Sequence, residues 1–286
     1  MAKSKTKIDV MSPDYKKTWR YDLKKNKVVY LLFSVIFVYY FVFHYLPMFG
    51  IVIGFQKYRP AKGILGSDWV GMKNFVKFFT DADAIGTFAL SLEVAIENTI
   101  ICILLGYPAA WILANKKLNR SAVTIVLFIM PMWINALMRT LATAELFHVM
   151  GVQLGKGTLI VGMVYDYLPF MIYPIYNILN KMDKSYAEAA SDLGATPWQV
   201  FWKVQVPLSM PGVVSGIMMV FMPTVSTFAI SEFLTNNKIK LFGTIIQENI
   251  NSSMWNYGAA LSLVMLIIIG ITSLLQDNKK EVNGVV

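Results

Sequence analysis

The chain has 286 residues, of which 56% are hydrophobic and only 15% are charged, with a mean hydropathy of +0.53. A soluble domain carries about 25% charged residues, so this composition excludes an ordinary soluble domain and indicates an integral membrane protein. The net charge of +9 does not indicate a nucleic-acid partner, because the basic residues gather at the N-terminus and in short loops between apolar stretches, where membrane topology places them.

Six apolar stretches are long enough to cross a bilayer, which takes roughly 20 mainly apolar residues. The first is too long for the core of a signal peptide, so we expect a retained anchor. The third is interrupted by Pro131, Asn135 and Arg139, and the fifth contains Pro223, which a membrane helix tolerates where neighbours satisfy the freed backbone. The sequence predicts an all-α integral membrane protein with six transmembrane helices, at 28–53, 88–114, 122–147, 158–179, 210–234 and 255–275.

An even number of spans places both termini on one side of the membrane. The segments on that side are 1–27, 115–121, 180–209 and 276–286, which hold 9, 3, 3 and 2 basic residues, or 17 of the 26. The excess of Lys and Arg predicts that both termini are cytoplasmic, in a multi-pass protein of the cell (plasma or inner) membrane. The chain then divides into a basic cytoplasmic N-terminus (1–27), a single transmembrane domain (28–275) with a cytoplasmic loop at 180–209, and a cytoplasmic tail (276–286). The basic N-terminus either binds anionic lipid head groups or is a solvated determinant of topology.

The segment 55–87, between the first two predicted spans, mixes aromatic and basic residues. That composition is typical of an amphipathic helix lying in the membrane interface. We therefore expect an interfacial helix here, on the outer membrane surface.

The loop 180–209 is polar in a chain that is otherwise almost continuously apolar. Ser185 is followed three residues later by Glu188, which predicts a capping box and a short helix that begins at Ser185. Gly194 follows where a helix prefers a left-handed residue at its C-terminus, because glycine has no side-chain penalty there.

A second short helix is predicted directly after the glycine. Thr196 and Gln199 form another predicted capping box, with Pro197 at the favoured first helical position. Pro207 and Pro211 are predicted to end this helix before the fifth span begins.

Two short helices joined by a sharp turn form a compact unit close to the membrane. Ala189 and Ala190 are small and allow another backbone to approach closely. One interpretation is that the pair docks into a cleft on a cytoplasmic partner. The other is that an amphipathic loop packs against its own bundle, and the residue pattern alone leaves both open.

The stretch 188–207, EAASDLGATPWQVFWKVQVP, resembles the signature loop of binding-protein-dependent ABC importer permeases. The resemblance lies in a Glu-Ala-Ala triplet, a glycine four residues later, and a Val-x-Val-Pro ending. The family usually has isoleucine and leucine before the proline, where this chain has two valines. The motif lies in the expected loop of a chain with the expected number of spans.

The resemblance implies the type I ABC importer permease fold, with 28–275 as the permease domain and 180–209 as its coupling loop. It implies that this loop docks on an ATP-hydrolysing partner through Glu188, Ala189, Ala190 and Gly194, with Pro207 closing the motif. The chain itself then is not an enzyme and has no catalytic residue, no metal and no cofactor, because ATP and Mg are bound by the partner ATPase. The implied partners are a second homologous permease subunit, an ATP-binding-cassette ATPase dimer, an extracytoplasmic substrate-binding protein and membrane lipid, with no nucleic acid.

Asp166 is the sharpest candidate for the substrate pathway, because an ionisable residue inside a span is expensive to keep there. It is flanked by Tyr165 and Tyr167 in the sequence VYDYLPF. A carboxylate beside aromatic rings suits an organic cation, which gains ion pairing and cation–π attraction together. The alternative is a structural hydrogen-bond acceptor between helices.

Other candidates for the pathway have plainer alternatives. Glu93 and Glu97 share one face of the second span. The alternative for either residue is exposure to water at the outer boundary of the membrane, and the same alternative applies to Glu145 at the end of the third span. Trp133 is a candidate lining residue, although tryptophan is more often found in the interfacial belt or the core.

Residues 98–270 resemble the spermidine/putrescine permeases, in stretches such as LLGYPAAWILA, GMVYDYLPFMIYPIY and WNYGAALSLVM. After Arg139-Thr140 the chain has LATAELF where that subfamily usually has aromatics. The N-terminal third instead resembles the oligosaccharide-type ABC permeases. We predict a polyamine importer from the longer match, with an oligosaccharide importer as the alternative.

Enzymes and ATPase-independent proteins are less consistent with these residues. The stretch GVQLGKGT is one spacer short of a phosphate-binding loop and has glycine where Ser or Thr should follow the lysine. The two histidines, His44 and His148, have no zinc-enzyme spacing, and the single Cys102 excludes an internal disulfide and a cysteine-based zinc site. A channel or receptor that works without an ATPase has no use for the paired coupling helices.

Overall fold

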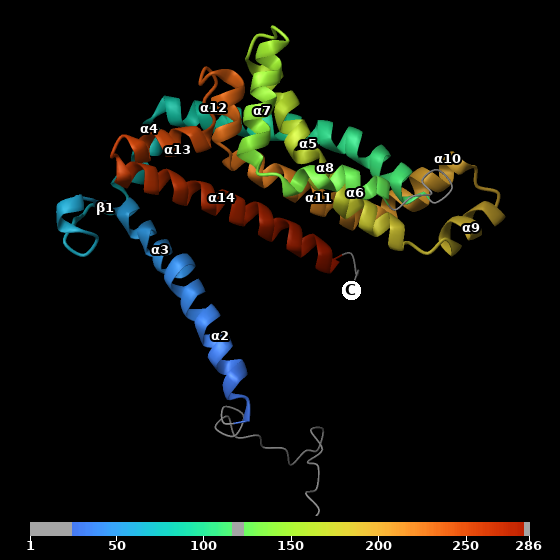
Figure 1. The fold of residues 1–286 in the computed structure, drawn as a ribbon, viewed down its shortest axis with the longest axis horizontal. Helices are drawn as coiled ribbons and strands as arrows, with labels where there is room; N and C mark the ends of the chain where they lie inside the picture. Colours follow the sequence, from blue (N-terminus) through green and yellow to red (C-terminus); the bar gives the residue numbers. More distant parts are fainter. Residues whose placement is uncertain (1–24, 116–122, 283–286) are drawn as a thin grey trace, which may run out of the picture. The chain divides into compact units, whose positions relative to one another are not determined.

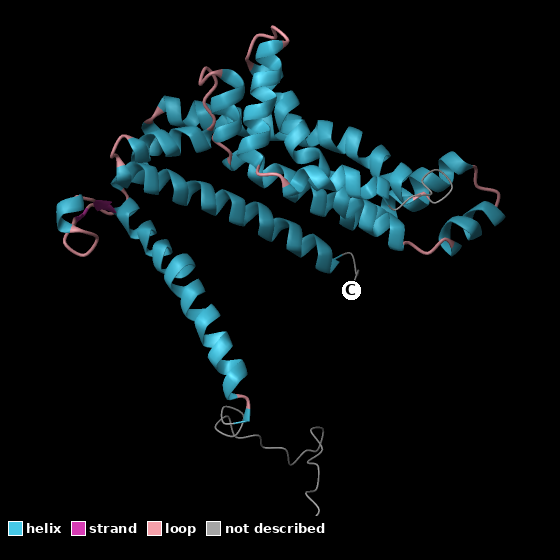
Figure 2. Cartoon of the chain, viewed as in Figure 1, coloured by secondary structure: helices cyan, strands magenta, loops and turns pink. Residues whose placement is uncertain are grey.

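The computed structural model describes residues 25–115 and 123–282, with side chains as far as residue 273. Helices dominate this part of the chain (Figure 2), and its only strands are β1 (Gln56–Lys57) and β2 (Asp68–Trp69), which pair antiparallel with Gln56 opposite Trp69. The basic N-terminal segment, the 115–121 loop and the side chains of the C-terminal tail lie largely outside the described residues, so their predicted roles stay predictions.

Within the described residues, five helical segments are long and apolar enough to cross a membrane. The first comprises α2 (Lys27–Tyr40), the π-helix η1 (Phe41–Tyr45), α3 (Leu46–Met48) and the 3-10 helix η2 (Phe49–Phe55). It is apolar on every side, as a helix surrounded by lipid tails requires. Most of it belongs to a unit that ends at Ile51, and the rest of the chain from Val52 forms a second unit. The other four segments, all in the second unit, are Ala82–Ala114, Lys156–Lys181, Pro197–Ser226 and Trp255–Ser273.

The predicted third span, 122–147, is not one straight helix. The helix α6 (Val123–Ile129) and the 3-10 helix η4 (Met130–Trp133) meet α7 (Ala136–Val149) at an angle of 94°. Pro131 opens the 3-10 turn, and Asn135 caps α7 by accepting a hydrogen bond from the Leu137 amide at 2.9 Å. The six predicted spans are therefore five, or six when this bent pair counts as a single span.

The core of the second unit is built where α5 (Ala82–Ala114), α8 (Lys156–Lys181) and α11 (Val206–Ser226) run side by side (Figure 1). Gly212 and Gly216 lie four residues apart on α11, in the small-xxx-small pattern that lets membrane helices approach closely. A Cβ at Gly212 would lie 2.9 Å from the Pro174 carbonyl oxygen of α8. Met171 fills the space between the helices and is fully buried.

Gly212→Ala is expected to destabilise the bundle by about 1–3 kcal/mol, because backbone atoms of α8 occupy the position of the new methyl group and α11 must move outward. The measurement is the thermal stability of the detergent-solubilised complex. Gly270→Ala in α14 (Trp255–Val282) is the matched control, since a Cβ there meets nothing within 4 Å. Equal loss of stability in both variants would contradict the packing described here.

The predicted fifth span, 210–234, differs from the structure at both ends. The prolines at 207 and 211 do not end the preceding helix, because α10 (Pro197–Val200), the π-helix η5 (Phe201–Gln205) and α11 follow one another without a break. The Val206 amide bonds to the Phe201 carbonyl, and this wider π turn directly before Pro207 accommodates a residue that has no amide proton to donate. At the other end α11 stops at Ser226, and α12 (Ala229–Thr235) is a separate helix.

The helices α4 (Lys73–Thr80), α12 and α13 (Phe242–Asn251) gather at one end of the second unit, and the 185–200 helix pair lies at the other end (Figure 1). Within the segment 55–87, the predicted amphipathic helix is the eight-residue α4, and its place on the outer membrane surface stays a prediction. It packs on its own bundle, however, with Phe75 and Phe78 buried. The Tyr257 hydroxyl donates to Asp81 at 2.9 Å and ties the end of α4 to α14.

Candidate functional site

The first of the two paired helices, α9 (Ser185–Asp192), does not begin with the predicted capping box. Its N-terminus is satisfied from outside, because the Asp183 carboxylate accepts a hydrogen bond from the Ser185 amide at 3.0 Å. Hydrogen bonds from the Ser185 amide and hydroxyl hold the pKa of Asp183 below its usual value. Asp183, two residues ahead of the helix, therefore caps the helix in place of the predicted Ser185–Glu188 pair.

Gly194 ends α9 in the left-handed conformation, with φ of +85°, as predicted. The Gly194 amide donates to Ser191 O at 2.9 Å, and the Ala195 amide donates to Ala190 O at 3.1 Å. These two bonds form a Schellman motif, which satisfies the last carbonyls of the helix. A glycine is needed here for its backbone conformation alone, since a Cβ would meet nothing within 4 Å.

The second helix begins with the capping box predicted at Thr196. The Thr196 amide donates to the Gln199 side chain at 2.9 Å, and the Gln199 amide donates to the Thr196 hydroxyl at 3.4 Å. The end of α9 and the start of α10 are therefore each fixed by hydrogen bonds between near neighbours.

The two helices present an exposed surface of mixed polar and large apolar side chains, which we call the docking face. Within α9 no residue is buried, and Glu188 and Ala189 are exposed while Ala190 is half-buried. The docking face also contains large apolar side chains, which are Tyr186, Leu193 (90% exposed), Trp198 (69% exposed) and Trp202. Because these side chains are exposed, the helix pair is not an amphipathic loop with its apolar residues packed on the chain's own bundle.

Three contacts join the segment that directly follows the docking face, which is η5 and the start of α11, to α5. The Trp111 indole of α5 donates to Gln205 at 2.7 Å, and the Tyr107 hydroxyl lies 2.8 Å from the Ser209 hydroxyl of α11. Phe201 packs edge-on against the Trp111 ring, with 5.7 Å between centroids. Because α10 also continues directly into α11, the docking face is connected to both α5 and α11.

Asp166 lies in the interior of the second unit, where only 2% of its surface is exposed. Its position is ten residues after Lys156, or about 15 Å along α8, near the middle of this 26-residue helix. Arg139 of α7 forms an ion pair with it, with 3.3 Å between Arg139 Nε and Asp166 Oδ1. The Thr140 hydroxyl donates to Asp166 Oδ2 at 3.1 Å. The carboxylate therefore does join two helices, as the structural alternative expects.

The two flanking tyrosines lie on different sides of this ion pair. Tyr165 is 48% exposed, and its ring centroid is 5.9 Å from the Arg139 guanidinium carbon. Tyr167 is half-buried and packs edge-on against Phe170, with 6.4 Å between centroids. The sequence pattern predicts a site made of a carboxylate and aromatic rings, but it does not identify Arg139 as their partner. An arginine inside an apolar stretch was the available signal, because it needs a counter-charge.

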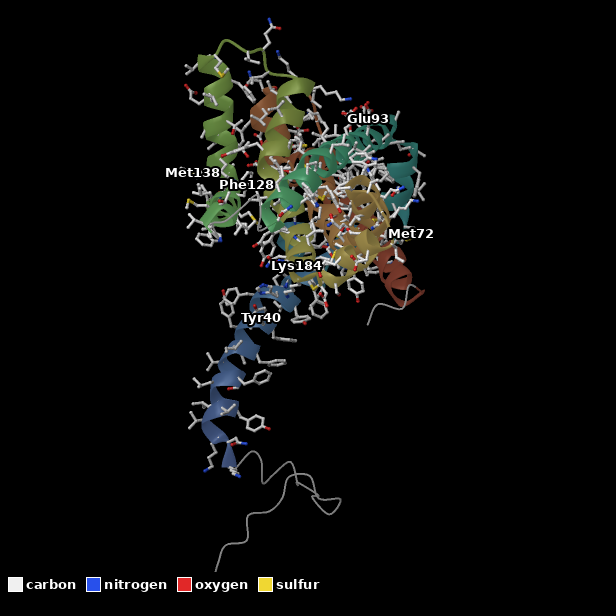
Figure 3. The ribbon with its side chains drawn as sticks, turned by 90° about the vertical axis from the view of Figure 1, so that its right-hand side faces the viewer. Tyr40, Met72, Glu93, Phe128, Met138 and Lys184 are labelled. Carbon is white, nitrogen blue, oxygen red and sulfur yellow. The ribbon has the colours of Figure 1, made fainter. Side chains whose placement is uncertain are left out.

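The remaining predicted pathway residues lie elsewhere. Lys156 bridges Glu93 and Glu97, at 2.6 Å and 3.0 Å, so neither carboxylate lacks a counter-charge; Glu93 is marked on α5 in Figure 3. Trp133 is 77% exposed at the break before α7. Glu145 is exposed on α7, about 9 Å along the helix from Arg139.

Comparison with known proteins gives a consistent result. A family model described as "binding-protein-dependent transport system inner membrane component" matches residues 98–278. The spermidine/putrescine transport system permease protein PotB of Escherichia coli K12 is 34% identical over 199 residues, which covers 63% of this chain and 72% of that protein. The protein of the same name from Haemophilus influenzae is 32% identical over 199 residues, covering 63% of this chain and 70% of that protein.

Two further similarities involve carbohydrate transporters. The polygalacturonan/rhamnogalacturonan transport system permease protein YteP of Bacillus subtilis is 44% identical, over 79 residues that cover 28% of this chain and 22% of that protein. A chain in the crystal structure of a bacterial alginate ABC transporter, in complex with a periplasmic protein bound to alginate pentasaccharide, superposes with a TM-score of 0.64. That match covers 92% of this chain and 96% of the other, and at 16% identity it shows a shared fold alone.

Proposed function

The chain belongs to the family of binding-protein-dependent transport system inner membrane components and is a permease subunit of an ABC importer, and from this premise we propose that it carries polyamines. The observation that carries the proposal is the 34% identity to a spermidine/putrescine permease over 199 residues. The multi-pass arrangement of apolar helices accords with an inner-membrane permease.

The chemistry around Asp166 supports an organic cation as the cargo. A carboxylate near the middle of a membrane helix, with Tyr165 half exposed beside it, provides ion pairing and cation–π attraction. Transporters commonly bind their substrates near the bilayer midplane. We assign Asp166, Tyr165 and Tyr167 to the substrate pathway. Glu97, Trp133 and Glu145 are proposed to lie further along that pathway.

The docking face is proposed to contact a partner ATPase. Glu188, Ala189, Ala190 and Gly194 lie on the exposed helix pair, and Pro207 is exposed where α10 and η5 lead into α11. ATP and Mg are bound and hydrolysed by the partner, and this chain contributes no catalytic group. With the docking face in the cytoplasm and the bent α6–α7 pair counted as one span, both termini are cytoplasmic as well. A second permease subunit completes the membrane pathway, and an extracytoplasmic binding protein delivers the polyamine.

Transport then follows alternating access. ATP binding closes the ATPase dimer and moves the docking face, and that movement reaches α5 and α11 through the contacts of Trp111, Phe201 and Ser209. The pathway opens outward to receive substrate, and hydrolysis resets it. The cycle requires that substrate and nucleotide each bind the two states with different affinity.

An oligosaccharide importer is the second candidate, and one observation favours it. The 79-residue stretch that is 44% identical to a polygalacturonan/rhamnogalacturonan permease has a higher identity than the polyamine permeases reach over their longer matches. We place polyamines first because the match to the spermidine/putrescine permease covers 63% of the chain, whereas the match to the polygalacturonan/rhamnogalacturonan permease covers 28%.

The two candidates are separated by the ATPase activity of the complete complex, co-expressed from neighbouring genes and reconstituted in lipid with its binding protein. Spermidine, putrescine and a panel of oligosaccharides are added in turn. The proposal predicts stimulation by the polyamines alone. Stimulation by an oligosaccharide alone would transfer the assignment to the second candidate.

A further inference from the structure

The ion pair between Arg139 and Asp166 is buried but incompletely hydrogen-bonded. The side chains are 5% and 2% exposed, respectively. Among the described residues, Arg139 Nε, Arg139 Nη1 and Asp166 Oδ1 are buried polar atoms without a hydrogen-bond partner. Arg139 Nη2 reaches only the backbone oxygen of Asp166, at 3.5 Å. A guanidinium can form two parallel hydrogen bonds to a carboxylate, and this one does not. The attraction within the pair therefore offsets only part of the cost of burying the two charges.

Arg139 occupies both of the features that an organic cation would use at this place. Its guanidinium lies beside the Asp166 carboxylate, and the same group lies 5.9 Å from the Tyr165 ring centroid. A substrate ammonium would seek the same carboxylate oxygen and the same ring face. Thr140 holds only Oδ2, so Oδ1 is the oxygen at which one cation can replace another.

The two charges sit on elements that are packed differently. Asp166 belongs to α8, in the tightly packed core beside α5 and α11. Arg139 lies four residues after Asn135, in the first turn of the 14-residue α7, which begins at the 94° break. A positive charge in the first turn is disfavoured by the helix dipole. Its neighbour Met138 is 64% exposed and lies on the outward side of α7 (Figure 3). A rotation of α7 about the break would withdraw Arg139 and leave α8 in place.

We propose that Arg139 is a resident counter-ion that substitutes for the transported ammonium group at Asp166. In the substrate-free state the guanidinium neutralises the carboxylate. In the loaded state the ammonium of the polyamine takes its place, and the return of Arg139 to Asp166 displaces the substrate toward release. This inference rests on the proposed polyamine function and assigns Arg139 as a positioning residue within it.

The test compares Arg139→Gln, Asp166→Asn and the double variant in the complete complex in lipid nanodiscs and proteoliposomes. Binding of radiolabelled spermidine is measured without the binding protein, and uptake is measured with it. Arg139→Gln removes the competitor, so it is expected to bind spermidine about tenfold more tightly while its maximal uptake rate falls. The double variant removes both charges and is expected to regain normal yield and thermal stability without regaining binding or uptake. Lys240→Gln with Glu248→Gln is the matched control, an exposed ion pair of 2.8 Å, and should leave binding and uptake unchanged.

Two results would overturn the proposal. If Arg139→Gln has unchanged spermidine affinity, or if the double variant regains uptake together with stability, the ion pair is only structural. The double variant decides the question even where the single variants fail to assemble, because it carries no buried unpaired charge. If instead the unaltered complex shows no ATP-dependent spermidine uptake, the polyamine function fails, and the exchange that rests on it fails too.

Discussion

Asp166→Asn is expected to lower ATP-dependent polyamine uptake by about a hundredfold or more. The substitution removes the carboxylate that we propose pairs with the substrate ammonium, and it leaves the buried Arg139 without its counter-charge. A hydrogen bond to a charged group contributes about 1.5–3 kcal/mol, and 1.4 kcal/mol corresponds to about a tenfold change in affinity. Breaking the buried pair also lowers the stability of the complex, which is a separate effect. The measurement is initial uptake of radiolabelled spermidine in proteoliposomes, normalised to the amount of assembled complex.

The matched control for this substitution is Glu248→Gln, which also removes a carboxylate from an ion pair with a basic residue. Glu248 pairs with Lys240 at 2.8 Å near the end of the bundle opposite the docking face, and both side chains are well exposed. An exposed pair contributes little, so uptake should stay close to normal. Normal uptake by Asp166→Asn would show that the carboxylate has no part in transport.

Gly194→Val is expected to separate the permease from its ATPase. The residue adopts φ of +85°, where a β-branched side chain is strongly disfavoured, at a cost of about 1–3 kcal/mol. The last turn of α9 would therefore lose its Schellman hydrogen bonds, and the docking face would lose its shape. We expect insertion in the membrane to stay normal while co-purification of the ATPase and substrate-stimulated hydrolysis both fall.

Gly194→Asn is the matched control, because asparagine tolerates the left-handed conformation better than other non-glycine residues. It should retain most of the ATPase binding and most of the stimulation. If Gly194→Val co-purifies with the ATPase as well as the unaltered chain does, the turn has no role in docking.

Features set by neighbours in the sequence are the ones that could be predicted. Gly194 adopts a left-handed conformation because the helix before it ends there, and Thr196 and Gln199 satisfy each other's amides across three residues. The apolar spans are likewise local, since their length and composition decide them. The resemblance of 188–207 to the permease signature loop agrees with the family match. That resemblance is a matter of shared sequence, and the physical chemistry of the loop alone does not identify the family.

Features that depend on a choice between local alternatives were less predictable. Asp183 and Glu188 were both available to cap α9, and the structure uses the Asp183 carboxylate. Pro207 predicts the end of a helix, but the π turn directly before it lets the helix continue into α11. Pro131 and Asn135 indicate an interruption of the third span, but they do not specify the 94° bend or the packing of α7 against α8 and α12.

Contacts between distant residues could not be predicted from one sequence. Arg139 and Asp166 are 27 positions apart, and nothing local to either residue specifies the other. The same holds for Lys156, which forms ion pairs with two glutamates of α5, so that neither carboxylate is an unpaired charge. The sequence indicated which residues are expensive to bury, and only the fold showed how each charge is compensated.

We propose that this permease imports polyamines with energy from ATP. The most direct measurement is the accumulation of radiolabelled spermidine in proteoliposomes that contain the complete complex, with ATP or ADP on the ATPase side and loaded binding protein on the other. The account predicts accumulation with ATP only, reduced by unlabelled putrescine and unaffected by oligosaccharides. ATP-dependent accumulation of an oligosaccharide, with none of spermidine, would contradict it.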